Sequence, residues 1–110
     1  MPEAAEAERL DVLVVYCPVE ATQQVLAALF AAGAGVIGDY QECAFVSRGT
    51  GQFRPVRQAR PSVGRVGERE QVDEDRVELT VRRRLVPAVV AALRQAHPYE
   101  EPAFHVLRTG

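Results

Sequence analysis

Twice along this chain, an apolar strand-like segment is followed at once by apolar residues at helical spacing. Residues 10–16 are largely apolar and rich in β-branched side chains, as expected for a strand covered on at least one face, and Pro18 ends the segment. Residues 19–32 then carry apolar side chains on one helical face, and Gly33 is placed as a C-terminal cap. A strand that leads directly into a helix predicts a layered fold in which the helix covers the sheet.

The second strand–helix unit lies in the C-terminal half of the chain. Residues 76–81 alternate polar and apolar side chains, which is typical of a half-buried strand. The apolar residues of 85–96 recur at helical spacing, with Pro87 tolerated in the first turn and Pro98 ending the helix. Residues 103–107 predict a short final strand.

The middle of the chain is predicted to contain a β-hairpin and a long loop. Residues 42–47 and 52–56 flank the tripeptide Gly49-Thr50-Gly51, an arrangement typical of two short strands joined by a glycine turn. Residues 57–74 are rich in Arg, Gly, Pro, Asp and Glu and carry few apolar side chains, so they predict a long loop that is mobile or ordered by a ligand.

The resulting order, β-α-β-β-α-β with hairpin material in the middle, matches an α+β ferredoxin-like plait, an antiparallel sheet with two helices on one face. With 110 residues the chain is the size of one domain, which we place at residues 9–110. The acidic, alanine-rich residues 1–8 are predicted to be a disordered N-terminal extension. Because a small domain buries a limited share of its surface, the second face of the sheet is expected to be covered by self-association.

Charge excludes several classes of partner. The formal net charge is -2, from 13 basic and 15 acidic residues, so no overall field attracts nucleic acid or an anionic membrane. Every basic residue is an arginine, which excludes lysine Schiff-base chemistry and leaves bidentate anion contacts available. Without an apolar membrane-length segment or the pattern of a signal peptide, the protein is expected to be cytoplasmic, with Cys17 and Cys43 reduced.

Five ordered blocks of sequence carry the most specific information. They are residues 32–35, 38–45, 49–55, 63–67 and 92–104, and the last block contains His97-Pro98-Tyr99-Glu100-Glu101-Pro102. Together the blocks resemble the CutA/PII-like domain that is inserted in Nif-three-like proteins, and the resemblance spans most of the chain. It implies a free-standing version of that domain, without the flanking domains that carry the dinuclear metal centre of the family.

The resemblance also implies an assembly. CutA and PII proteins are trimers of ferredoxin-like subunits, so a homotrimer is expected, with clefts between subunits that bind a small ligand or metal as a sensor or regulator. The relatives commonly read Ala-Tyr-Asp-Val-Tyr where this chain has residues 103–107, so that His105 replaces an acid. This substitution adds a metal ligand or titrating group that the relatives lack.

The hexapeptide supports two interpretations. In one, Pro98 and Pro102 stiffen a connector between helix and strand, Tyr99 anchors it by packing, and the domain serves only to oligomerise. In the other, imidazole, carboxylate and thiolate groups converge on a divalent metal, zinc or copper, and the candidate ligands are His97, Glu101, Cys43 and His105. Their spacing in the sequence is not that of a known metal motif, so only the fold can bring them together.

A third interpretation is a PII-like nucleotide or anion site at the glycine-rich segment. A glycine turn exposes backbone N–H groups, and the guanidinium groups of Arg48, Arg54, Arg57 and Arg60 suit phosphate. Catalysis is not predicted, because Cys43 and His97 have no identifiable third group to orient them as a nucleophile pair. Contacts to a small ligand are expected from Tyr40, Gly49, Thr50, Gly51, Arg54, Tyr99 and Glu100.

Overall fold

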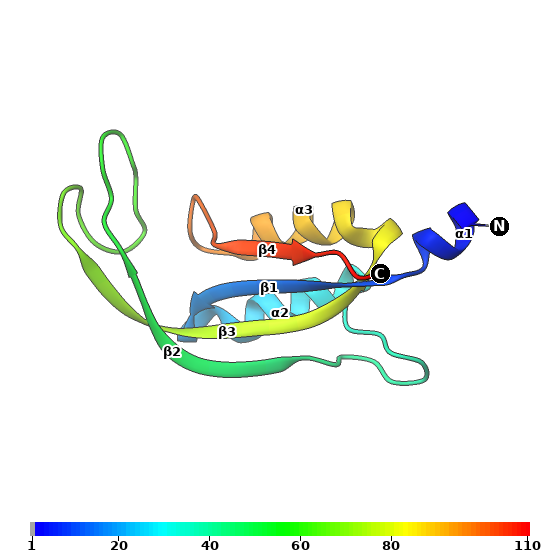
Figure 1. Cartoon of the computed structure of the whole chain (residues 1–110). Coiled ribbons are helices and arrows are strands. Elements are labelled where there is room, and N and C mark those ends of the chain that lie inside the picture. The colour runs from blue at the N-terminus through cyan, green and yellow to red at the C-terminus, as the bar shows by residue number, and fades with distance from the viewer. Residues whose placement is uncertain (1) are drawn as a thin grey trace.

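Four antiparallel strands form one sheet in the order β2-β3-β1-β4 in the computed structural model, which describes residues 2–110 (Figure 1). The strands are β1 (Leu10–Pro18), β2 (Phe45–Phe53), β3 (Glu70–Arg82) and β4 (Phe104–Leu107). The central strands β1 and β3 each lead into a helix, and every neighbouring pair of strands is antiparallel. The predicted α+β ferredoxin-like fold is confirmed.

Two helices cover one face of this sheet. A short 3-10 turn, η1 (Val19–Ala21), joins β1 to α2 (Thr22–Ala31), and a matching turn, η2 (Arg83–Leu85), joins β3 to α3 (Val86–Ala96). The core forms where the apolar stripes of the helices meet the apolar face of β1 and β3. Burying one such aliphatic side chain contributes about 1.5–3 kcal/mol. The fully buried members include Leu13, Val15, Val25, Leu29, Val77, Val89 and Leu93.

The opposite face of the sheet carries no helix among the described residues, and we call it the open face. Side chains alternate along a strand, so Val12 and Tyr16 of β1 lie on this face while Leu13 and Val15 enter the core. The same alternation places Phe45 and Leu107 on the open face, where they are 65% and 53% exposed.

The structure corrects the expected hairpin at Gly49-Thr50-Gly51. These residues lie inside β2, which runs unbroken from Phe45 to Phe53 and pairs with β3 along its whole length. Gly51 is explained by a close approach rather than by a turn, because a Cβ atom at this position would overlap the carboxylate of Glu74.

The real connection of the central hairpin is longer than a glycine turn. Residues 54–69 join β2 to β3, and β3 begins at Glu70, so the loop expected at 57–74 is shifted toward the N-terminus. Gly64 and Gly67 adopt positive φ there, which suits glycine in a tight loop. Residues 70–75 are polar except for Val72, and residues 70–73 extend β3 past its pairing with β1, which is why the sequence pattern alone favours a loop.

Residues Pro2–Ala7 form the short helix α1, where the sequence predicts a disordered extension over residues 1–8, and Met1 lies outside the described residues. Two acidic side chains hold this segment to the basic turn η2. Glu6 pairs with Arg83, and Glu8 pairs with Arg84 and with Arg82 of β3. The partners are more than seventy residues apart in sequence, so the local pattern cannot reveal them.

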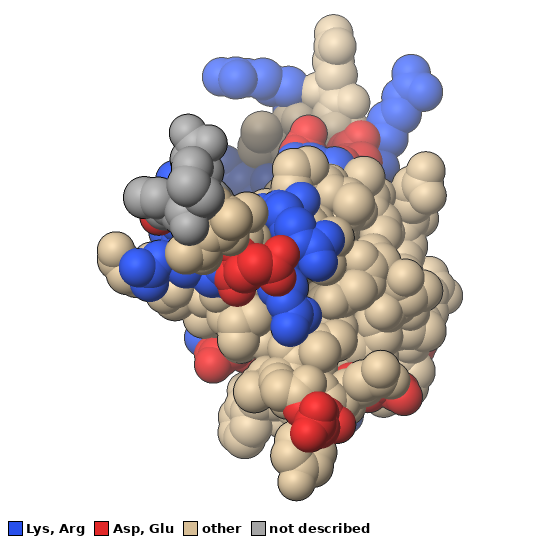
Figure 2. Space-filling model, turned by 90° about the vertical axis from the view of Figure 1, so that its right-hand side faces the viewer, with Lys and Arg blue, Asp and Glu red and all other residues tan. Residues whose placement is uncertain are grey.

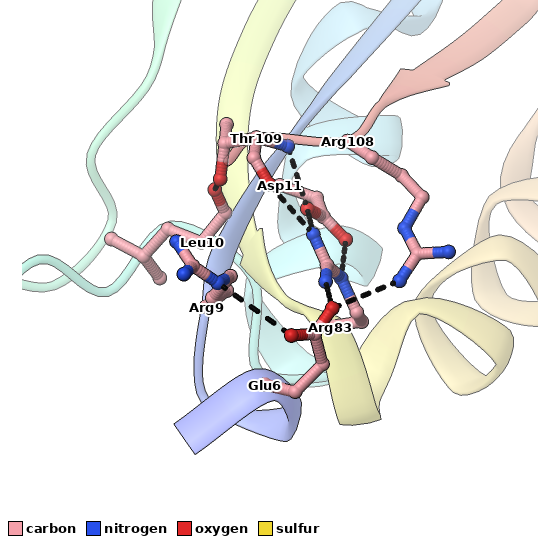
Figure 3. A network of polar contacts seen from close by, with 7 residues as sticks. All are labelled: Glu6, Arg9, Leu10, Asp11, Arg83, Arg108 and Thr109. Atoms are coloured by element: carbon pink, nitrogen blue, oxygen red, sulfur yellow. Dashed lines mark hydrogen bonds and ion pairs between the residues drawn. The ribbon is translucent and has the colours of Figure 1, made fainter. Parts of the chain in front are cut away.

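One buried ion pair joins the two ends of the chain to the β3–α3 junction (Figure 3). Asp11, which is 1% exposed, accepts hydrogen bonds from Nε and Nη2 of Arg83 at 2.9 and 2.7 Å. The backbone N–H of Thr109 donates to the same carboxylate at 3.2 Å, and the Thr109 hydroxyl donates to the carbonyl of Leu10 at 2.8 Å. The hydrogen bonds from Arg83 lower the pKa of Asp11 below its usual range, and the hydrogen bond from Thr109 makes a smaller contribution.

The end of the molecule that carries the termini bears both signs of charge. Figure 2 shows basic and acidic side chains next to one another on this end, with extended basic side chains at the top of the view, the side of loop 54–69 in Figure 1. None of the helices formed by residues 2–110 is long and apolar enough to cross a membrane.

Replacing the buried carboxylate tests the Asp11–Arg83 pair. Asp11→Asn should lower the free energy of unfolding at neutral pH by about 2 kcal/mol, since hydrogen bonds to a charged partner are replaced by weaker ones. The folded-state pKa of Asp11 is depressed, so its stabilisation is present above the ordinary carboxyl pKa and disappears as the pH falls below about 4. Denaturant unfolding at several pH values measures this loss.

Asp73→Asn is the matched control, because Asp73 is exposed and the described residues hold no ion pair to it. A constant difference between wild type and Asp11→Asn down to acid pH would contradict the role given to the carboxylate charge.

Candidate functional site

Two adjoining hollows lie on the open face near the far end of the β2–β3 ribbon. The first, the connector pocket, has a volume of about 360 Å³ and lies between loop 54–69, the end of β2 and the hexapeptide connector, residues 97–102. The second, the strand pocket, has a volume of about 430 Å³ and lies over residues 47–52 of β2. The two hollows share the lining residues Tyr16, Gln52, Glu74 and Ala103.

His97 opens the hexapeptide connector and is locked in place by both of its ring nitrogens. Pro98 keeps His97 extended, at φ -74° and ψ 134°, so α3 stops at Ala96. The backbone N–H of Tyr99 donates to Nδ1 at 3.1 Å, which makes Nδ1 an acceptor. Nε2 therefore carries the proton and donates to the carbonyl of Tyr16 at 2.7 Å. The ring is 5% exposed, and neither nitrogen is left for a metal in this arrangement.

Tyr99 packs its ring between two aromatic neighbours at the wall of the connector pocket. The ring centroids of Tyr99 and His97 are 5.0 Å apart, and those of Tyr99 and Phe53 are 5.9 Å apart. The Tyr99 hydroxyl is buried and lies beside the carboxylate of Glu74, although it makes no hydrogen bond of ordinary geometry with the described residues. Burial, followed by the nearby negative charge of Glu74, raises the pKa of Tyr99 to about 12, so the phenol stays neutral at physiological pH.

Glu100 fastens the outer wall of the connector pocket. The backbone N–H of Arg60 donates to Oε1 of Glu100 at 2.7 Å, which holds loop 54–69 against the hexapeptide connector. Within the loop, the N–H of Gly67 donates to the carbonyl of Pro55 at 2.6 Å and closes its base. Loop 54–69, which the sequence shows only to be charged and glycine-rich, therefore forms an ordered wall of the connector pocket.

The arginines of the strand pocket are paired with acids. Arg48 Nε donates to Asp75 at 2.8 Å, and the other Asp75 oxygen accepts from the hydroxyl of Thr22 at 2.6 Å. The Thr22 hydrogen bond, followed by that of Arg48, lowers the pKa of Asp75. Arg76 in turn donates to Glu78 at 2.8 Å. Of the predicted anion-binding arginines, Arg54 lines the connector pocket, where its side chain is exposed.

The structure does not bring the predicted metal ligands together. The N–H of Cys43 donates to the carbonyl of Gly35, and the N–H of Gly35 donates to the carbonyl of Thr80, which lies opposite Val12 of β1. His97 instead contacts Tyr16, which is four residues further along β1. At about 3.3 Å per strand residue, the two candidates are separated by more than 10 Å. Among residues 2–110, no group of three or more His, Cys, Asp and Glu side chains is arranged to hold a metal ion.

The other residues predicted to contact a ligand or metal do not lie together, and some of them are remote from both pockets. Tyr40 is exposed in the loop between α2 and β2, together with Cys43, and lines neither pocket. His105 is exposed on the open face, with its ring centroid 6.5 Å from that of Tyr16. Glu101 lines the connector pocket beside Tyr99 and Glu100, while Gly49, Thr50 and Gly51 line the strand pocket.

Among the pocket residues that sequence reasoning missed are Tyr16, Phe53 and Glu74. Tyr16 and Phe53 were expected only as strand residues, and Glu74 falls in the segment expected to be a loop. The available signal was the glycine inside β2, since Gly51 makes room for the side chain of Glu74 from the neighbouring strand.

Comparison with known proteins places this domain within longer chains. Over 106 residues it is 50% identical to a Mycobacterium tuberculosis protein named GTP cyclohydrolase 1 type 2 homolog, a match that covers 96% of this chain and 27% of that protein. A Bacillus subtilis protein of the same name is 47% identical over 97 residues, which are 88% of this chain and 26% of the relative. The chain thus spans about a quarter of the length of the curated relatives it matches. No protein family model matches it.

Solved structures give the same result for the fold. A Bacillus cereus protein related to NIF3 superimposes with a TM-score of 0.78 and 40% identity, over 92% of this chain and 26% of that one. The periplasmic divalent cation tolerance protein CutA from Archaeoglobus fulgidus superimposes with a TM-score of 0.66 and 14% identity, over 92% and 84% of the two chains. The likeness to CutA concerns the fold alone. The resemblance inferred from the five sequence blocks is confirmed.

The tautomer of His97 is a direct test of the connector geometry. At about pH 8, where imidazole is neutral, long-range ¹H–¹⁵N spectra should give His97 a protonated Nε2 and an unprotonated Nδ1. Exposed His105, for which the structure gives no hydrogen bond, serves as the internal control. A proton found on Nδ1 of His97 would mean that the hydrogen bond from Tyr99 is absent in solution.

Proposed function

This chain is a CutA/PII-like domain of the Nif-three-like kind, and on that premise we propose that it is a non-catalytic binding module that forms a homotrimer and takes up a small ligand in the connector pocket. The observation that carries the ligand proposal is a pocket bordered by three separate segments. It holds a half-buried carboxylate, Glu74, that pairs with no basic side chain of the described residues, and beside it a buried hydroxyl, Tyr99, that makes no hydrogen bond of ordinary geometry with them.

The pocket has the size and composition of a small-molecule site. Its volume of about 360 Å³ is within the usual range for such sites, and it combines aromatic and aliphatic walls with a few polar groups. Loop 54–69 forms one wall, and the hydrogen bond from the N–H of Arg60 to Glu100 holds it against the hexapeptide connector. Rigid strands supply the floor, which favours specific binding over adventitious contact.

The open face supports the trimer proposal. Phe45 and Leu107 are exposed on a sheet face that no described helix covers, and the hydroxyl of Thr80 is buried there without a hydrogen bond to any of residues 2–110. Three sheets packed through these faces would cover the apolar side chains. Because both pockets also lie on this face, a neighbouring subunit would border them and turn each into a cleft.

A divalent metal is the second candidate ligand, favoured by the name of the CutA protein from Archaeoglobus fulgidus, which refers to divalent cation tolerance. In this chain such a site would have to use Glu101 and the exposed His105, with ligands from more than one subunit, since His97 is already bonded at both nitrogens. Nucleotide binding at the strand pocket is less favoured, because Arg48 and Arg76 are paired and the exposed Arg54 lines the connector pocket instead.

The proposal assigns binding, rather than a chemical step, to this domain. The name of the curated relatives refers to GTP cyclohydrolase, but the chain corresponds to about a quarter of those proteins. Cys17 is fully buried, and burial raises the pKa of its thiol, which makes it a poor nucleophile. Cys43 and His97 lie too far apart to activate one another.

Charging the open face should break the assembly. Size-exclusion chromatography with light scattering is expected to give three times the chain mass for the wild type and a smaller species for Leu107→Asp. Val66→Asp is the matched control, because Val66 is exposed to a similar extent, 49%, but lies in loop 54–69. A wild-type monomer would contradict the trimer, and equal effects of both substitutions would contradict the choice of face.

Filling the connector pocket should abolish ligand uptake. Benzamide, a small neutral aromatic probe, is expected to shift backbone amide resonances of Phe53, Tyr99 and Ala103 at millimolar concentration. Ala103→Trp should remove these shifts, because Ala103 lines the pocket. Ala91→Trp on the exposed side of α3 should leave them unchanged. Shifts that persist in Ala103→Trp would place the probe elsewhere on the protein.

Dialysis against zinc chloride separates the metal candidate from the small-ligand proposal. We expect less than one bound zinc per chain in both wild type and Glu101→Gln. Stoichiometric zinc that is lost in Glu101→Gln and in His105→Ala would instead establish the metal site.

A further inference from the structure

We propose, on the basis of the small-ligand function above, that the connector pocket selects a small planar organic cation with N–H donors, such as an amidinium or guanidinium group, and that Glu74 is its counter-ion. The inference rests on the charge of the pocket lining, on the surroundings of Glu74 and on the aromatic rings near it.

The charged side chains around the connector pocket are mostly acidic. Glu74, Glu100 and Glu101 line it, and the one lining arginine, Arg54, has an exposed side chain that is free to extend into solvent. Arg48 and Arg76 of the strand pocket are neutralised by Asp75 and Glu78. The other arginines of loop 54–69, at positions 57, 60, 65 and 69, are exposed and do not line the pocket. At the lining itself an anionic ligand would therefore meet repulsion, and a cation attraction.

Glu74 is a half-buried acid that pairs with no basic side chain of the described residues. The hydroxyl of Tyr99 lies beside its carboxylate, and their interaction helps to raise the pKa of Tyr99. The side chain of Glu74 lies over Gly51, where a side chain on the neighbouring strand would cover it. A partly desolvated carboxylate without a basic partner is a favourable site for a positively charged donor.

Aromatic rings surround this carboxylate. Tyr16, Phe53 and Tyr99 all line the connector pocket, and Tyr99 stays a neutral phenol because its pKa is about 12. The electron-rich faces of such rings attract cations, and a planar cation can also stack on them. A carboxylate beside aromatic walls thus suits a flat, weakly hydrated cation better than a neutral molecule of the same shape.

The same lining disfavours an inorganic cation. Divalent metals need several oxygen, nitrogen or sulfur ligands at once, and residues 2–110 hold no cluster of three such side chains. The walls are instead largely apolar, and one oxygen of Glu100 is already used by the N–H of Arg60. An organic cation brings its own apolar surface and needs only one anionic contact.

Three probes of one shape and different charge test the selectivity. Benzamidinium, benzamide and benzoate are titrated into the full chain by calorimetry and by NMR. Benzamidinium is expected to bind at least about tenfold more tightly than benzamide, as a carboxylate contact and a cation–π contact together would produce. Its affinity should fall as sodium chloride is added, and benzoate should not bind.

Variants around Glu74 test the counter-ion. Glu74→Gln should reduce the affinity for benzamidinium to that of benzamide and leave benzamide binding unchanged. Gly51→Ala should weaken benzamidinium binding, because the new methyl group must push the Glu74 side chain aside. Gly49→Ala is the matched control: Gly49 lies outside the connector pocket, and an added Cβ atom there meets no atom within 4 Å. Thermal unfolding verifies that each variant is folded.

The outcomes separate this inference from the proposed function. If benzamide or benzoate binds as well as benzamidinium and Ala103→Trp blocks it, the pocket is a ligand site and the cation selectivity is overturned. An unchanged benzamidinium affinity in Glu74→Gln overturns the counter-ion role. If no probe binds and no amide of the connector pocket shifts, the small-ligand function itself fails.

Discussion

The register between β1 and β3 is the constraint on which the rest of the structure depends. Their pairing runs from Leu10 opposite Arg82 to Pro18 opposite Glu74, and it fixes both ends of the molecule at once. At one end it places Asp11 where Arg83 can reach it, and at the other it places Asp75 where Thr22 can donate to it. A slip by one residue would turn the apolar side chains of one of the two strands to the open face, so the core itself enforces the register.

The connector pocket follows from this register and from where α3 ends. Pro98 stops the helix, and His97 then bonds to the carbonyl of Tyr16 on β1, which sets the hexapeptide connector beside the sheet. The β2–β3 ribbon continues past that level because β3 extends to Glu70, so Phe53 and Glu74 face Tyr99 across the hollow. The two prolines, which the sequence identifies as stiffening elements, thereby position a binding wall. The structural and functional interpretations of the hexapeptide are compatible: His97 is structural, and Tyr99 with Glu100 borders the pocket.

The domain separates two kinds of polar interaction. The Asp11–Arg83 and Arg48–Asp75 pairs are closed, with each carboxylate satisfied by several donors and its pKa lowered. Glu74 and Tyr99 are open, because the carboxylate pairs with no basic side chain of the described residues and the buried hydroxyl beside it makes no hydrogen bond of ordinary geometry with them. In a small protein such unsatisfied groups cost stability, and they are found where a ligand or neighbouring subunit completes them. This contrast, rather than the content of histidine and cysteine, distinguishes the functional region.

The sequence by itself determined the order of strands and helices, the apolar faces that form the core, the proline-bounded connector and the family resemblance. Those features depend on periodicity and on local backbone restrictions, which short segments express on their own. Only the tertiary structure decided that Gly49 and Gly51 lie within a strand, that Arg48 is paired, that Cys43 is remote from His97, and that Glu74 borders a pocket. Each of these depends on which residue of one strand lies opposite which residue of another. That pairing brings together groups distant along the chain, and no local pattern encodes it.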